Sequence, residues 1–124
     1  MARDVDVLRR FFRDDYAGNE RRDLWAEDAV FELRFAPGGP MILRGKAAIW
    51  ERAKSSFAKY SSYRFTDVQI IPTTEDGLYV VTCSAESVVK ATGKPLREEY
   101  ANLFRLRDGL VVHRIEYHNP LAMP

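Results

Sequence analysis

Short turns divide the C-terminal half of the chain into long segments in which polar and apolar side chains alternate. The turns are Asp76-Gly77, Thr92-Gly93-Lys94-Pro95 and Asp108-Gly109, and the segments are 63–71, 78–90, 96–106 and 110–118. Alternation with a period of two is typical of strands, and tight glycine-containing turns between such segments are typical of hairpins. This half of the chain therefore predicts a meander of antiparallel strands.

The N-terminal half carries the helical signals. Val5, Leu8, Phe11, Phe12 and Tyr16 recur at helical spacing, which predicts a helix over residues 3–16. The later signals predict a short helix over 19–25, strands over 29–35 and 41–44, and a third helix from 45 to about 60. Helices that come before most of the strands favour an α+β fold, and 124 residues suit one domain, 1–124.

Composition narrows the function classes. The net charge is +1, which does not indicate a nucleic-acid partner, and the arginines near the N-terminus, Arg21 among them, alternate with acids as on a solvated helix surface. No apolar run approaches ~18 residues, so no membrane segment is expected. The single cysteine, Cys83, lies in an apolar strand and is predicted to be a buried structural thiol. We expect a cytoplasmic protein without a metal or other cofactor.

The last predicted strand, 110–118, contains an acid where a half-buried strand is normally apolar. Arg114, Glu116 and His118 share one face of it. Burying a carboxylate is costly unless it is paired or its pKa rises, and a carboxyl group with a raised pKa suits proton transfer at neutral pH. Glu116 is therefore the central candidate for an acid/base group. The alternative is an ion pair with Arg114 or Arg52 that only ties strand to helix.

Residues 24–30, residues 42–46 and the closing strand together resemble the nuclear transport factor 2-like superfamily over essentially the whole chain. The resemblance implies a cystatin-like α+β barrel, in which a cone-shaped, curved antiparallel sheet wraps on N-terminal helices. Two branches are the most similar. The phenazine-biosynthesis A/B proteins are dimers that help to condense a cyclohexenone amine precursor, and the SnoaL-like polyketide cyclases perform an intramolecular aldol reaction.

Position by position, the resemblance implies site residues. Glu116 falls where both branches place their acid/base carboxylate, and Asn102 falls where ketosteroid isomerases place an oxyanion-hole acid. Arg52 replaces the helix histidine of the phenazine proteins, and Ser56 matches a serine there. Leu33 stands where ketosteroid isomerases carry their catalytic base, so steroid isomerisation by that route is not expected.

The remaining candidates have two interpretations each. In the first interpretation, Asn102 orients the substrate together with Tyr100 or His118. In the second, Asn102 only bridges strands, and His118 lies at the rim of the pocket or at an interface. Several aromatic residues either line a hydrophobic substrate site or belong to the core. They are Trp25, Phe31, Trp50, Phe57 and Phe104. Tyr16, at the end of the first predicted helix, either points its hydroxyl into the pocket or links the helix to the sheet.

Two functions follow from these patterns. The favoured one is a small cofactor-independent enzyme, an isomerase, cyclase or condensation enzyme of secondary metabolism, acting on a small, mostly apolar carbonyl or imine substrate. The other is a noncatalytic ligand-binding or accessory protein. If the protein is an enzyme, we expect a pocket of roughly 300 Å³ or more with Glu116 at its wall. We also expect a homodimer through the outer sheet face, including Val111, His113 and Leu103.

Overall fold

A computed structural model describes residues 2–13 and 19–119. The first half contains helix α1 (Ala2–Phe11), helix α2 (Asn19–Asp23), strand β1 (Trp25–Leu33), strand β2 (Met41–Arg44) and helix α3 (Lys46–Phe57). The second half contains strands β3 (Tyr60–Pro72), β4 (Leu78–Val89), β5 (Pro95–Arg107) and β6 (Leu110–His118). The α+β class is confirmed. Strand β6 matches its predicted segment, β4 ends one residue before the predicted end, and β3 and β5 extend beyond their predicted segments at both ends.

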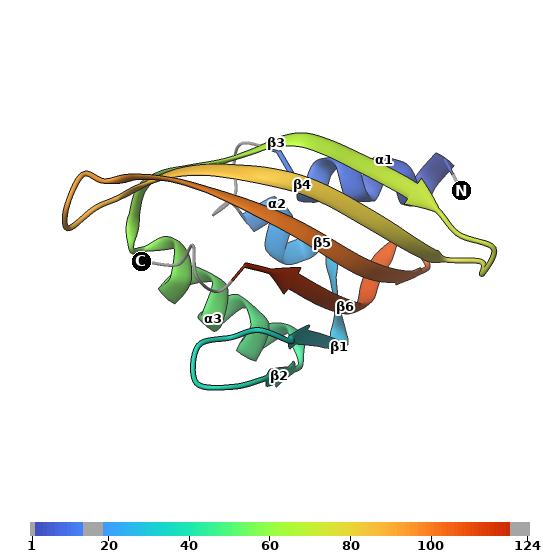
Figure 1. The fold of residues 1–124 in the computed structure, drawn as a ribbon. Helices are drawn as coiled ribbons and strands as arrows, with labels where there is room; N and C mark the ends of the chain where they lie inside the picture. Colours follow the sequence, from blue (N-terminus) through green and yellow to red (C-terminus); the bar gives the residue numbers. More distant parts are fainter. Residues whose placement is uncertain (1, 14–18, 120–124) are drawn as a thin grey trace.

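Within the described residues, six strands form one sheet in the order β2-β1-β6-β5-β4-β3. Neighbouring strands are antiparallel except for β1 and β6, which are parallel. The sheet curves, and the helices lie on its concave side (Figure 1). The predicted antiparallel sheet is therefore correct except at this pairing, which joins strands from opposite ends of the chain. The sheet is also not closed into a barrel, because β2 and β3 are its two edges.

The turn residues explain why the meander forms. Gly77 has a φ of +77°, a backbone conformation that glycine adopts without strain. A Cβ atom at this position would lie 2.8 Å from the carbonyl oxygen of Leu106, so the turn also needs a residue without a side chain. Such turns return each strand alongside its predecessor, as the sequence predicted.

Helix α1 is shorter than its periodic pattern predicts. It ends at Phe11, although Phe12 is still buried, and the predicted continuation to residue 16 is wrong at Phe12 and Arg13. Residues 14–18, with Tyr16, lie outside the described part. Helix α3 also ends earlier than expected, at Phe57, because β3 begins at Tyr60.

The core lies between the helices and the concave face of the sheet. Its centre is aromatic: the ring of Phe11 packs edge-on against those of Trp25 and Phe104, with centroids 5.5 and 5.2 Å away. Cys83 is buried in the same layer, and burial raises the pKa of its thiol to about 11. The prediction of a buried cysteine is therefore confirmed. In the described part of the chain, no helix is long and apolar enough to cross a membrane.

Candidate functional site

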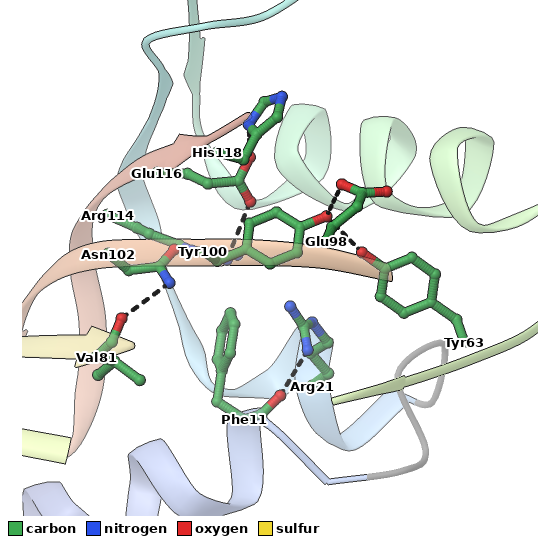
Figure 2. A network of polar contacts seen from close by, with 10 residues as sticks. All are labelled: Phe11, Arg21, Tyr63, Val81, Glu98, Tyr100, Asn102, Arg114, Glu116 and His118. Carbon is green, nitrogen blue, oxygen red and sulfur yellow. Dashed lines mark hydrogen bonds and ion pairs between the residues drawn. The ribbon is translucent and has the colours of Figure 1, made fainter. Parts of the chain in front are cut away.

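Strand β6 carries three polar side chains into the concave side of the sheet. Arg114, Glu116 and His118 alternate along the strand, so all three point to one face, and each is less than a tenth exposed. This confirms the shared face that the sequence predicted. Figure 2 shows them stacked above Asn102 and Tyr100 of β5.

Arg114 is at one end of the row that Arg114, Glu116 and His118 form along β6. Its Nε donates to Oδ1 of Asn102 at 3.0 Å, and its Nη2 donates to Oε1 of Glu116 at 3.2 Å. The guanidinium also lies over the ring of Phe31, 4.6 Å from the centroid, and within 5.2 Å of the Phe11 centroid. Polar and aromatic contacts therefore fix the guanidinium, and the guanidinium in turn fixes one oxygen of Glu116.

Glu116 lies between two cationic groups. Its second oxygen, Oε2, is 3.2 Å from Nδ1 of His118. Burial favours the neutral acid, but His118 and Arg114 outweigh it and hold the pKa of Glu116 below its usual value. The expected rise of this pKa is therefore wrong, because the paired cations dominate. The same contact with Glu116 raises the pKa of His118. The contact therefore favours the ionised carboxylate of Glu116 and the protonated imidazole of His118.

A second arginine, Arg21, enters the same region from α2. Its Nη1 donates to the carbonyl oxygen of Phe11 at 2.6 Å, and its guanidinium lies 4.1 Å from the centroid of the Phe11 ring. Burial and the nearby charge of Arg114 lower the pKa of Arg21 to about 9. The prediction that Arg21 belongs to a solvated helix surface is wrong, since the residue is 6% exposed. None of the described carboxylates is within ion-pair distance of it.

A chain of hydroxyl groups forms the neighbouring wall. The hydroxyl oxygens of Tyr63 and Tyr100 are 2.6 Å apart, and the Tyr100 hydroxyl lies 2.7 Å from Oε2 of Glu98 (Figure 2). Glu98 is 2% exposed, and its other oxygen, Oε1, is buried without a hydrogen-bond partner in the described structure. Burial raises the pKa of Glu98.

These groups border a cavity of about 120 Å³ between α3, β1 and the concave face of the sheet. Of the residues proposed from the sequence, those that line it are Glu116, His118, Trp25, Phe31, Arg52, Ser56, Phe57 and Tyr100. Other residues that line it include Arg21, Arg114, Tyr60, Tyr63 and Phe65. Glu116 stands at the wall as expected, but the cavity is smaller than the roughly 300 Å³ expected for an enzyme pocket.

Three of the proposed residues do not line the cavity. Asn102 is behind Arg114, and its Nδ2 donates to the carbonyl oxygen of Val81 at 3.2 Å, so it links strands and supports Arg114. Phe104 is fully buried in the core. Trp50 is half-buried on α3 and is not among the residues that line the cavity. Tyr16 lies outside the described residues.

Arg21, Glu98 and Tyr63 belong to the site but were not among the residues predicted from the sequence. Arg21 stands in a run of mixed charges that looks like a solvated surface. Tyr63 opens a predicted strand, and its register against Tyr100 could not be known before the strands were paired. Glu98 did carry a signal, because it shares the alternating face of Tyr100 and Asn102, and a carboxylate on a core-facing position is unusual.

A concave sheet with buried ionisable groups around a small cavity defines a pocket protein with the means for acid/base chemistry. The chain belongs to the SnoaL-like domain family, whose model matches residues 1–114. It is similar to the uncharacterised protein YesE of Bacillus subtilis, with 32% identity over 82% of this chain and 69% of YesE. It is also 30% identical to an uncharacterised PhzA/B-like protein of Pseudomonas aeruginosa, over 80% of this chain and 70% of that protein.

Solved structures agree with this assignment. A candidate isomerase from Bacillus subtilis superposes with a TM-score of 0.84 at 30% identity, covering 98% of this chain and 89% of that chain. A phenazine biosynthesis-related protein from Pseudomonas aeruginosa superposes with a TM-score of 0.82 over 98% of this chain and 82% of that chain. Its identity is 19%, so it shows the shared fold alone. The resemblance to the SnoaL-like and phenazine A/B-like branches is therefore confirmed.

Proposed function

We propose that this chain is a small cofactor-independent enzyme that moves protons next to a carbonyl or imine group, as an isomerase, cyclase or condensation enzyme of secondary metabolism. The observation that carries the proposal is the buried carboxylate of Glu116, held between Arg114 and His118 at the wall of a cavity. The similarity to a candidate isomerase and to a PhzA/B-like protein supports the same class of chemistry.

The chemistry needs only groups that border the cavity. The Glu116 carboxylate takes a proton from a carbon next to a carbonyl, so a C–H bond breaks, an O–H bond forms, and the electron pair moves to the carbonyl oxygen. The protonated imidazole of His118 or a tyrosine hydroxyl donates a hydrogen bond to that oxygen. Glu116 then returns the proton to a second carbon. In a cyclisation or condensation, the enolate carbon instead forms a bond to another carbonyl carbon, the electron pair of that carbonyl moves to its oxygen, and this oxygen takes the proton from Glu116.

The charges of the site define the substrate further. Arg21 and Arg114 are both buried, whereas Glu116 is the one carboxylate in the described site whose pKa is held low. A buried guanidinium without a counter-charge is costly, so an anionic ligand stabilises Arg21. A cavity of about 120 Å³ is close to the size of a single six-membered ring. We therefore propose a one-ring keto acid or imino acid as the substrate class.

Deuterium incorporation next to a ketone tests this function. In D₂O, the protein is expected to exchange the α-hydrogens of 3-oxocyclohexane-1-carboxylate faster than those of its neutral carboxamide, by about 10-fold in kcat/KM, because a charged hydrogen bond contributes about 1.5–3 kcal/mol. Arg21→Met is expected to remove this preference. Arg22→Met is the matched control, because Arg22 belongs to the same helix but is 40% exposed and pairs with Asp23. Nuclear magnetic resonance follows the exchange.

Equal exchange of the acid and the amide by the wild-type protein would overturn the anionic substrate class. Exchange of neither ketone above the rate in buffer would count against the enzyme and favour the second candidate, a noncatalytic ligand-binding protein. The observation that favours this candidate is the ion pair between Glu116 and Arg114, which holds the carboxylate in place. Calorimetric binding of the keto acid without turnover is its expected result.

We also propose a homodimer through the outer face of the sheet. Val80, Leu103 and Ile115 are paired across β4, β5 and β6 and form a half-exposed apolar row there. Val111, which was expected on this face, is fully buried and faces the core instead. Light scattering is expected to give twice the 14.3 kDa chain mass, and Leu103→Arg is expected to halve it. A wild-type mass of one chain would contradict the dimer.

A further inference from the structure

Arg52 lines the cavity, as Arg21 and Arg114 do, but the acid/base step proposed above gives it no role. Helix α3 places it there. Ile49, Arg52 and Ser56 recur at intervals of three and four residues, so they share one side of the helix, and all three line the cavity. An arginine on the side of a helix that faces a core is unusual, because burying its charge is costly. The position of Arg52 therefore calls for a group that its charge can bind.

The guanidinium of Arg52 has an unused donor. Its Nε atom is buried and has no hydrogen-bond partner in the described structure. The ion pair with Glu116 that the sequence left open is not formed, because Oε1 of Glu116 faces Arg114 and Oε2 faces His118. None of the other carboxylates in the described part of the chain is within ion-pair distance of Arg52 either. A buried N–H without an acceptor is costly, and an acceptor on a ligand removes this cost.

The charges of the lining leave places for two anionic groups. Glu116 is the only carboxylate among the described residues that line the cavity, and it pairs with Arg114. The keto acid proposed above supplies one carboxylate, which pairs with Arg21. Arg52 is then the one arginine of the described lining without a counter-charge. Arg52 is half-buried, whereas Arg21 is 6% exposed, so a group bound to Arg52 lies in the more exposed part of the cavity and does not share the deep part with the ring.

We propose that Arg52 is a specificity-determining residue that binds a second carboxylate of the substrate, so that the substrate class is a one-ring keto acid or imino acid with two carboxylates. This rests on the proposed function, which supplies the ring and the first carboxylate. The planar fork of a guanidinium matches a carboxylate, because its Nε and one Nη can donate two parallel hydrogen bonds. In the alternative, the aliphatic stem of Arg52 packs on the cavity wall and water hydrates the charge. Such a residue does not distinguish a second carboxylate from an amide.

Calorimetric binding of two nearly identical compounds tests the second carboxylate. They are 5-oxocyclohexane-1,3-dicarboxylate and its half-amide, 3-carbamoyl-5-oxocyclohexane-1-carboxylate. The wild-type protein is expected to bind the dicarboxylate about 10-fold more tightly, because a hydrogen bond between two charged groups is stronger than one to a neutral amide. Arg52→Met keeps an apolar stem but removes the charge, and it is expected to bring this ratio of Kd values to about one.

Variants of the neighbouring cations locate the effect. Lys54→Met is the matched control, because Lys54 belongs to α3 but is 50% exposed and pairs with Glu51 at 2.9 Å, and it is expected to keep the wild-type ratio. Arg21→Met is expected to weaken both compounds by a similar factor and to keep the ratio, because Arg21 binds the first carboxylate of each. Arg52→Lys keeps a positive charge and is expected to recover part of the ratio, which separates loss of charge from loss of the fold. Equal Kd values in the wild type, a ratio that persists in Arg52→Met, or a ratio that disappears in Arg21→Met would overturn the proposal.

Deuterium exchange of the dicarboxylate supplies a second readout. Arg52→Met is expected to raise KM by about 10-fold with a smaller effect on kcat, because the second carboxylate takes no part in the proton transfer and is bound equally in the ground state and the transition state. A loss in kcat alone would contradict a role in specificity. Absence of exchange in the wild type and in every variant would overturn the enzyme, while the ratio of Kd values would still decide whether Arg52 binds a second carboxylate.

Discussion

Replacing Glu116 by glutamine is expected to slow deuterium exchange of the keto acid by about 10²- to 10⁴-fold, which is the usual contribution of a general base. Glutamine has nearly the same shape and still accepts a hydrogen bond from Arg114, but it cannot take a proton from carbon. The loss is therefore expected in kcat, with the affinity for the keto acid largely kept. Exchange rates measured at several ketone concentrations separate the two effects.

Glu99→Gln is the matched control for this substitution. Glu99 lies on β5, the strand next to β6, but its side chain is 67% exposed, and its Oε2 accepts a hydrogen bond from Ser84. The Glu99→Gln variant is expected to exchange the α-hydrogens of the keto acid at the wild-type rate. Equal rates in the wild type and in Glu116→Gln would count against a catalytic role for Glu116.

The same variant changes the titration of His118. Because Glu116 raises the pKa of His118, removing its charge is expected to lower that pKa towards or below the ordinary 6.5. Because the pKa of His118 is raised in the folded protein, His118 contributes stability that is present below pH 6.5 and is lost as the pH rises through the folded-state pKa. Glu116→Gln is expected to abolish this pH dependence of the free energy of unfolding. The two histidines of the chain can be followed separately by nuclear magnetic resonance.

Much of the fold could be predicted from the sequence, because the strands and turns depend on local sequence signals. The glycine turns and the alternation in β4, β5 and β6 fix both the strands and the faces that they bury. The parallel pairing of β1 with β6 was not accessible, because it joins residues such as Phe31 and Arg114 that are far apart in the chain. Nothing in either strand alone indicates the direction of its partner.

The sequence could predict only those parts of the site that lie on a single strand. Arg114, Glu116 and His118 share a face by period alone, so their neighbourhood could be predicted from β6. The pKa of Glu116 could not be, because its sign depends on how closely the two cations approach the carboxylate. Arg21 was missed because a charge run on a short helix looks the same whether one arginine points outward or into an aromatic core.

Replacing Arg114 by methionine is expected to lower the free energy of unfolding by about 3–5 kcal/mol at pH 7, because it leaves the carboxylate of Glu116 buried without its guanidinium. It also leaves Oδ1 of Asn102 without its donor. Arg97→Met is the matched control. Arg97 makes ion pairs with Asp67, Glu86 and Glu99, but its side chain is 51% exposed, so its loss is expected to cost about 0–1 kcal/mol. Urea denaturation measures the free energy of unfolding of both variants and of the wild type.

The pH dependence distinguishes the buried pair from simple loss of packing. In the wild type, the lowered pKa of Glu116 gives stability that is present above the ordinary value of 4.5 and is lost as the pH falls through the folded value. The difference between Arg114→Met and the wild type is therefore expected to narrow in acid. The double variant Arg114→Met/Glu116→Gln is expected to lose less than the sum of the single losses, because no lone charge remains buried. A difference that stays constant with pH, together with additive losses, would mean that Arg114 stabilises the fold through its aromatic contacts alone.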